Sequence, residues 1–352
     1  MIDWKVALAT ASRLARPGPD LGAAEVAVVV AELREAAARA EAPVRDYTRL
    51  QATGALGAPS PVLVVDRPRW VEANLGTFRL LTDPISRKLT EAGRVPTAGW
   101  SKSVGEKVSG AQVGAVLSFV SSKVLGQFDP FWTGPGGEGG RLLLVAPNIV
   151  AAERQLDVDP HDFRLWVCLH EETHRVQFTA VPWLREHMRS LIDELVDATE
   201  LDDQAVGAVM EQLVGQVVKA IRGEGDASLS SVFQNERQRD LVDQMTGVMS
   251  LLEGHADVVM DGVGPQVVPS VAEIRRKFQR RRQGSGGLDR IVRKLLGLDA
   301  KAQQYRDGAV FVRQVVDAVG IEGFNAVWSG PDHLPSKAEI LEPASWLARV
   351  HA

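Results

Sequence analysis

The sequence contains one cysteine, Cys168, among its 352 residues, which excludes an intramolecular disulfide framework. A cysteine-poor chain is typical of a reducing compartment, and we expect a cytoplasmic location. No apolar run approaches the roughly 20 residues that a membrane-spanning helix needs. Residues 1–5 also lack the basic start and apolar core of a secretory signal. Cys168 lies two residues before His170 and so points to a different side of the expected helix, and it is interpreted as a small packed hydrophobic residue and not as a ligand or nucleophile.

The chain has no large excess of either charge, with a formal net charge of −5 and 24% charged residues. This composition gives no reason to expect a nucleic-acid or anionic-membrane partner. The basic run at 275–282 is the local exception. We interpret it as a solvated helix end, and the alternative is a contact surface for an acidic partner. The oligomeric state is left open.

Apolar spacing predicts a mainly α fold with a small β element. Long helices are expected over residues 23–40, 70–92, 104–128, 184–198, 204–221, 236–260 and 300–319, with a kink or break at Pro84. Residues 141–145 form the best strand candidate, 62–65 a second, and the glycine-rich 134–140 a loop. We expect a single domain over 1–352, either undivided or built as two lobes. The first would span about 1–150, helical with short strands, and the second about 151–352, with the metal site.

Histidine is scarce, with seven in the chain, yet His170 and His174 lie four residues apart in the motif HExxH. On a helix, positions i and i+4 share one face, so both imidazoles can reach a single metal ion. Glu171 is rotated by about 100° around the helix, where it can act on a metal-bound water without being a ligand. The motif therefore predicts a zinc hydrolase with Zn2+ as its cofactor.

The surrounding residues place this motif on the inward face of a helix. An unpaired buried imidazole is costly, whereas a metal-bound one is satisfied. A buried histidine pair with structural hydrogen bonds is the alternative interpretation. The apolar stripe consists of Phe163, Val167, His170, His174 and Phe178, and Pro160, Asp162 and Pro182 mark the expected helix ends.

Catalytic zinc usually has three protein ligands, so a third must come from elsewhere in the chain. Glu253 and Asp257 are four residues apart and reproduce the ExxxD arrangement of glutamate zincins. In that arrangement the glutamate binds the metal and the aspartate holds the free ring nitrogen of a liganding histidine. His255 is the rival third ligand, and a regular helix can present only one of the two to the metal. A surface position for Glu253 is the remaining alternative.

Several segments together resemble one family, the zincin-like hydrolases of high-GC bacteria. The resemblance is carried by the HEETH motif, by 251–257 (LLEGHAD), by 127–131 (QFDPF) and by 331–335 (PDHLP). Residues 2–4 and 15–19 are closer to a branch labelled as associated with biosynthesis of the deazaflavin coenzyme. The resemblance implies a helical zincin-like metallohydrolase fold, with His170, His174 and Glu253 as ligands and Glu171 as the base. The chain shows no nucleotide- or flavin-binding motif, so the coenzyme association rests on the family label.

The expected activity is hydrolysis of an amide bond, with a peptide or small amide as the substrate. The strand at 142–145 would pair with an extended substrate as an edge strand, with the 134–140 loop as a flap. An ordinary core strand is the alternative. Two other functions remain open: a non-peptide amidohydrolase in coenzyme metabolism, and a non-catalytic binding or regulatory protein on a zincin scaffold. Glu171 argues against the second, because a purely structural zinc site needs no base.

Overall fold

The structure is a computed structural model that describes all residues except 1, 52–59, 92–99, 135–138, 199–234 and 285–297. Most of the described chain is helical. The helices are α1 (Trp4–Leu14), α2 (Ala23–Thr48), α3 (Arg67–Glu91), α4 (Trp100–Ser121), α5 (Ala146–Leu156), α6 (Pro160–Ala180), α7 (Leu184–Asp197), α9 (Glu236–Gly262), α10 (Val271–Gly284), α12 (Leu298–Phe324), α13 (Lys337–Leu341) and α14 (Pro343–Val350). Two short 3-10 turns, Asn325–Trp328 and Pro331–His333, join α12 to α13. No described helix is long and apolar enough to cross a membrane.

Three short strands form one small sheet, β1 (Val62–Val65), β2 (Gly126–Asp129) and β3 (Arg141–Val145), in the order β1-β3-β2. β1 runs parallel to β3, and β2 runs antiparallel to it. β3 is the central strand and is buried along its whole length. The strand predicted at 142–145 is therefore present, but its expected role as a substrate-pairing edge is wrong. Both of its edges already carry a neighbouring strand, and its apolar run suits a strand covered on both faces.

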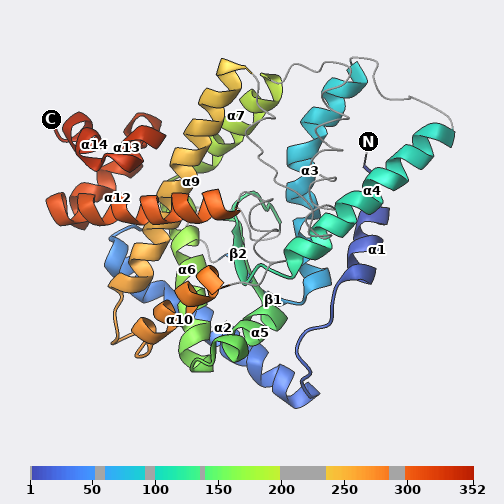
Figure 1. Ribbon diagram of the computed structural model, residues 1–352, viewed down its shortest axis with the longest axis horizontal. Helices are drawn as coiled ribbons and strands as arrows, with labels where there is room; N and C mark the ends of the chain where they lie inside the picture. The colour runs from blue at the N-terminus through green and yellow to red at the C-terminus, as the bar shows by residue number, and fades with distance from the viewer. Residues whose placement is uncertain (1, 52–59, 92–99, 135–138, 199–234, 285–297) are drawn as a thin grey trace.

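The two faces of β3 contribute to two separate cores, because side chains alternate along a strand. Leu142 and Leu144 belong to the main core, whereas Leu143 and Val145 face a smaller cluster formed mainly by α1, α3 and α4. Figure 1 shows α1, α3 and α4 gathered on one side of the sheet, with α9 and α12 to α14 on the other. The sheet thus separates a small helical layer from the main core.

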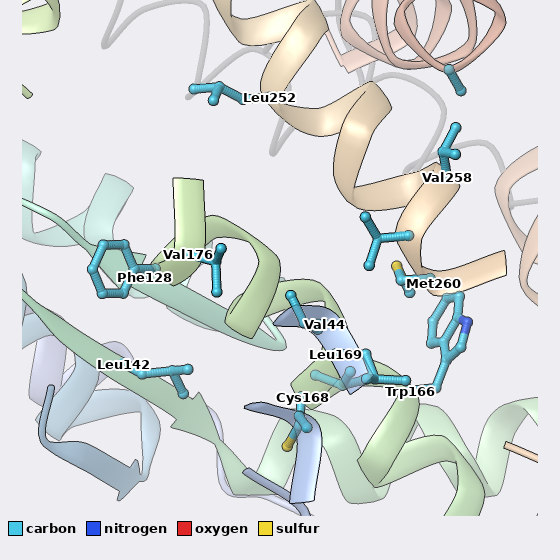
Figure 2. Packing of buried hydrophobic residues seen from close by; sticks show 14 of the residues in the cluster. Val44, Phe128, Leu142, Trp166, Cys168, Leu169, Val176, Leu252, Val258 and Met260 are labelled. Atoms are coloured by element: carbon cyan, nitrogen blue, oxygen red, sulfur yellow. The ribbon is translucent and has the colours of Figure 1, made fainter. Parts of the chain in front are cut away.

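Helix α6 runs through the main core and contacts α2, α9 and β2. Pro160 is the first residue of the helix, and Asp159 is its N-cap. The Asp159 side chain accepts a hydrogen bond from the backbone amide of Asp162. Figure 2 shows Cys168 and Leu169 of α6 in the same hydrophobic cluster as Val44 of α2, Leu142 of β3 and Met260 of α9. A helix buried against several elements is held rigidly, which suits the presentation of ligands.

The described elements agree with most of the predicted ones. α2 extends past its predicted end at 40, and α3 continues through Pro84 without ending there. The helix predicted over 104–128 stops at Ser121, and Gly126–Asp129 forms β2 instead. The helix expected over 204–221 lies outside the described residues, as does most of the 134–140 loop.

Helices α9 and α12 approach each other so closely at Gly254 that this position has no room for a side chain. A Cβ there would lie 2.2 Å from the carbonyl carbon of Gly308 on α12. This contact brings the two backbones together beside Glu253, so glycine at 254 fixes the depth at which that part of α9 lies.

Candidate metal centre

Two helices bring three ligand-type side chains together. His170 and His174 lie one turn apart on α6, and Glu253 approaches them from α9. The two Nε2 atoms are 3.2 Å apart, and the Glu253 Oε2 lies 3.6 Å from that of His170 and 3.9 Å from that of His174. Within the described part of the chain, these three residues form the group whose donor atoms all lie within 4.8 Å of one another.

The spacing of these donor atoms fits one zinc ion. Zinc holds nitrogen and oxygen at about 2.0–2.2 Å, so two ligands at a tetrahedral angle lie about 3.3–3.5 Å apart. The observed separations of 3.2 to 3.9 Å bracket that value. Two imidazoles and one carboxylate are also a typical donor set of a catalytic zinc site with one position left for water. The three side chains are 14–28% exposed, so the group is not sealed from solvent.

Glu171 lies on a different side of α6 and contacts strand β2. The backbone amide of Phe128 donates a hydrogen bond to its carboxylate. Gly126, two residues earlier, leaves the space that the side chain occupies. A Cβ at 126 would lie 2.6 Å from the Glu171 Cγ and 2.7 Å from its Oε1. The strand thus holds the carboxylate from one side and requires glycine at 126.

The electrostatic surroundings of Glu171 are unfavourable for a carboxylate. Burial raises the pKa of Glu171 well above its ordinary value, and the nearby carboxylate of Glu253 raises it further. The hydrogen bond from Phe128 opposes this rise in pKa. A cation bound by the half-buried Glu253 would offset the repulsion that its carboxylate exerts on Glu171. The charge distribution therefore agrees with the donor spacing.

The structure places His255 outside this group of donors. Its ring is fully buried, with centroids 5.2 Å from Phe324 and 5.6 Å from Trp328. Burial, and then the neighbouring His174, lowers its pKa to about 3, so the ring is neutral. The Glu253 carboxylate, and not this imidazole, faces the two histidines of α6.

Asp257 does not occupy the place that the sequence predicted for it. Its carboxylate pairs with Arg275 of α10, and Arg313 of α12 lies 3.8 Å from its Oδ2. The first residue of the basic run 275–282 is therefore a largely buried ion-pair partner and not part of a solvated surface. An arginine supplies a full charge and two donors to the aspartate, which a neutral histidine ring cannot match.

The ring nitrogens that face away from the ligand cluster have other neighbours. The Nδ1 of His174 lies 2.9 Å from the side-chain oxygen of Gln177, and the Nδ1 of His170 lies 3.3 Å from the Met260 sulfur. Gln177 was not singled out in the sequence. Its spacing of three residues from His174 was the available signal, because residues i and i+3 share a helix face.

An HExxH helix and a second helix that together present two imidazoles and a carboxylate, within a mainly helical fold, define a zincin-type protein. The chain belongs to the zincin-like metallopeptidase family, whose model matches residues 2–347. It is also similar to a crystal structure from Chloroflexus aurantiacus, titled "a putative hydrolase with a novel fold", at 31% sequence identity. That match covers 100% of this chain and 99% of the other, with a TM-score of 0.71. No match is found among the curated proteins.

Proposed function

We propose that this protein is a zinc-dependent hydrolase of amide bonds, with peptides as its substrates. The observation that carries the proposal is the placement of Glu171. It is a buried carboxylate next to a cluster of three ligand-type side chains, and it is not itself one of them. Family membership supports the same class of activity.

His170, His174 and Glu253 would hold the zinc. Bound there, zinc supplies a Lewis acid that polarises the scissile carbonyl and lowers the pKa of a bound water toward about 7. Glu171 then accepts the proton of the attacking water and delivers it to the leaving nitrogen. The Phe128 amide keeps the carboxylate aligned, and Gly126 leaves it room.

A direct test uses the zinc-loaded protein and its Glu171→Gln variant on a peptide library and on a panel of small non-peptide amides. Glutamine keeps the size of the side chain but cannot accept the proton. We expect cleavage of peptides by the wild type, a loss of turnover of about 10²–10⁴-fold in the variant, and unchanged zinc content. Cleavage of the small amides alone would favour an amidohydrolase, such as one in coenzyme metabolism.

Two results would overturn the proposal. An unchanged rate in the Glu171→Gln variant would remove Glu171 as the base. A zinc-loaded wild type that cleaves neither set of substrates would instead favour a binding or regulatory protein on a zincin scaffold.

A further inference from the structure

Gln177 is a fully buried residue of α6 whose side-chain amide makes three polar contacts. Its Nε2 donates to the backbone carbonyl of Leu252 at 2.9 Å and lies 3.0 Å from the Nδ1 of His255. Its Oε1 lies 2.9 Å from the Nδ1 of His174. One amide therefore connects an imidazole of the metal centre to two residues of α9.

The direction of this amide follows from hydrogen-bond chemistry. The Leu252 carbonyl can only accept, so the NH2 end of Gln177 must face it. The Oε1 end then faces His174 and can itself only accept, which requires the proton of that ring on Nδ1. A neutral imidazole protonated at Nδ1 has its lone pair on Nε2. That atom is the one lying 3.2 Å from the His170 Nε2.

The same reasoning explains the buried His255. Its Nδ1 must accept from Gln177, so its proton lies on Nε2. No hydrogen-bond partner of that Nε2 is found in the described part of the chain. The contact with Gln177 thus compensates the burial of this ring, and it uses the second hydrogen of the amide.

We propose that Gln177 is the positioning residue of this metal centre: it selects the tautomer of His174 and links it to the segment of α9 that carries Glu253. Leu252 and His255 lie on either side of Glu253 in the chain, so the amide ties two ligands on different helices to each other. The inference deepens the proposed function and rests on the zinc site that it assumes.

The first measurement needs no metal. Histidine-selective 15N labelling of zinc-free protein at about pH 8, above the ordinary histidine pKa of about 6.5, reports which ring nitrogen carries the proton. The His174 signals are assigned by their absence from a His174→Ala variant. We expect the Nδ1–H form in the wild type and a loss of that preference in Gln177→Leu. Observation of the Nε2–H form in the wild type would overturn the proposal.

The second measurement is zinc affinity by competition with a chelator. Gln177→Leu removes the acceptor and should weaken zinc binding by roughly 10–100-fold. Gln177→Glu keeps an acceptor for the His174 Nδ1–H, although it loses the donors to Leu252 and His255. Its zinc affinity should stay within about threefold of wild type. Both variants disturb the contact with α9, but only Gln177→Leu removes the acceptor for His174. A difference in zinc affinity between them therefore distinguishes a role in positioning His174 from a role in packing.

Met260→Leu serves as the matched control, because it alters the neighbour of the other liganding histidine, whose thioether is a weak acceptor. We expect a change of less than about threefold in zinc affinity. Equal affinity of Gln177→Leu and wild type would contradict the proposal, as would equal losses in the leucine and glutamate variants. A wild type that binds no zinc would instead refute the proposed function, and the tautomer measurement would still decide the orientation of the amide.

Discussion

Helix α6 carries buried charged groups on two of its sides, and the two sides balance charge differently. Toward α2, Glu172 accepts from the Arg175 Nε at 2.8 and 2.9 Å, and Glu41 of α2 lies 3.4 Å from the same guanidinium. Toward α9 and β2, Glu171 has another carboxylate, Glu253, as its charged neighbour.

The pKa shifts of the two adjacent glutamates show this difference. Burial raises the pKa of both Glu171 and Glu172. At Glu172 the hydrogen bond and charge of Arg175 oppose the rise, whereas at Glu171 the charge of Glu253 adds to it. The first side is a complete ion pair with a structural role. On the second side a bound cation would offset the repulsion between the carboxylates, as expected of a metal centre.

The largest expected effect concerns the third ligand. Glu253→Ala should reduce zinc affinity by more than the 10–100-fold that is typical of residues behind the ligands. His255→Ala removes a neighbour of Gln177 and leaves the three donors in place, so it should keep its zinc. Chelator competition on both variants measures the difference. Loss of zinc in His255→Ala with retention in Glu253→Ala would exchange the two roles.

The next prediction compares how much the buried glutamates on the two sides of α6 contribute to the free energy of unfolding. Glu172→Gln leaves the Arg175 charge buried with a weaker partner and should lower the free energy of unfolding by about 3 kcal/mol. Glu171→Gln removes a carboxylate that is repelled by Glu253, so it should cost the zinc-free protein nothing. Urea unfolding of zinc-free samples gives both values. Equal destabilisation by the two changes would remove the distinction between the sides.

A smaller effect is expected from Gly126→Ala. The new Cβ would lie 2.6 Å from the Glu171 Cγ, so the carboxylate must move. A displacement of about 1 Å can reduce turnover by about 10²-fold. Gly76→Ala is the matched control, because a Cβ there meets nothing within 4 Å. Kinetics on a peptide substrate and zinc content measure the effect, and full activity of Gly126→Ala would show that β2 does not position the base.

The smallest effect is expected from Asp257→Asn. Because this carboxylate pairs with Arg275, the change should leave zinc affinity within about threefold of wild type and cost about 1 kcal/mol of stability. Chelator competition and thermal unfolding provide the two values. A 10–100-fold loss of affinity would restore Asp257 to the role of holding a liganding histidine.

Local sequence patterns were sufficient for the strands at 62–65 and 141–145 and for the start of α6 at Pro160. They could not show that Arg141–Val145 is central, because strand order depends on segments far apart in the chain. Residues 126–129 contain glycine, glutamine and aspartate, and they become a strand only through their pairing with β3.

The candidate site shows the same limit. The spacing of His170 and His174 specifies a shared face on one helix, and the structure brings Glu253 to that face from α9. The partners of Asp257 and Gln177 could not be predicted from the spacing of residues along one helix. Arg275 lies on another helix, and the Leu252 carbonyl that orients Gln177 is a backbone group with no sequence signature. Whether the three donors bind zinc stays a prediction.

The most direct test of that claim is a zinc anomalous difference map from crystals of the reconstituted protein at neutral pH, where the ligands are deprotonated. We expect one peak per chain, about 2.0–2.2 Å from the Nε2 atoms of His170 and His174 and from a carboxylate oxygen of Glu253. No peak after reconstitution, or a peak bound by a His255 nitrogen in place of Glu253, would contradict it.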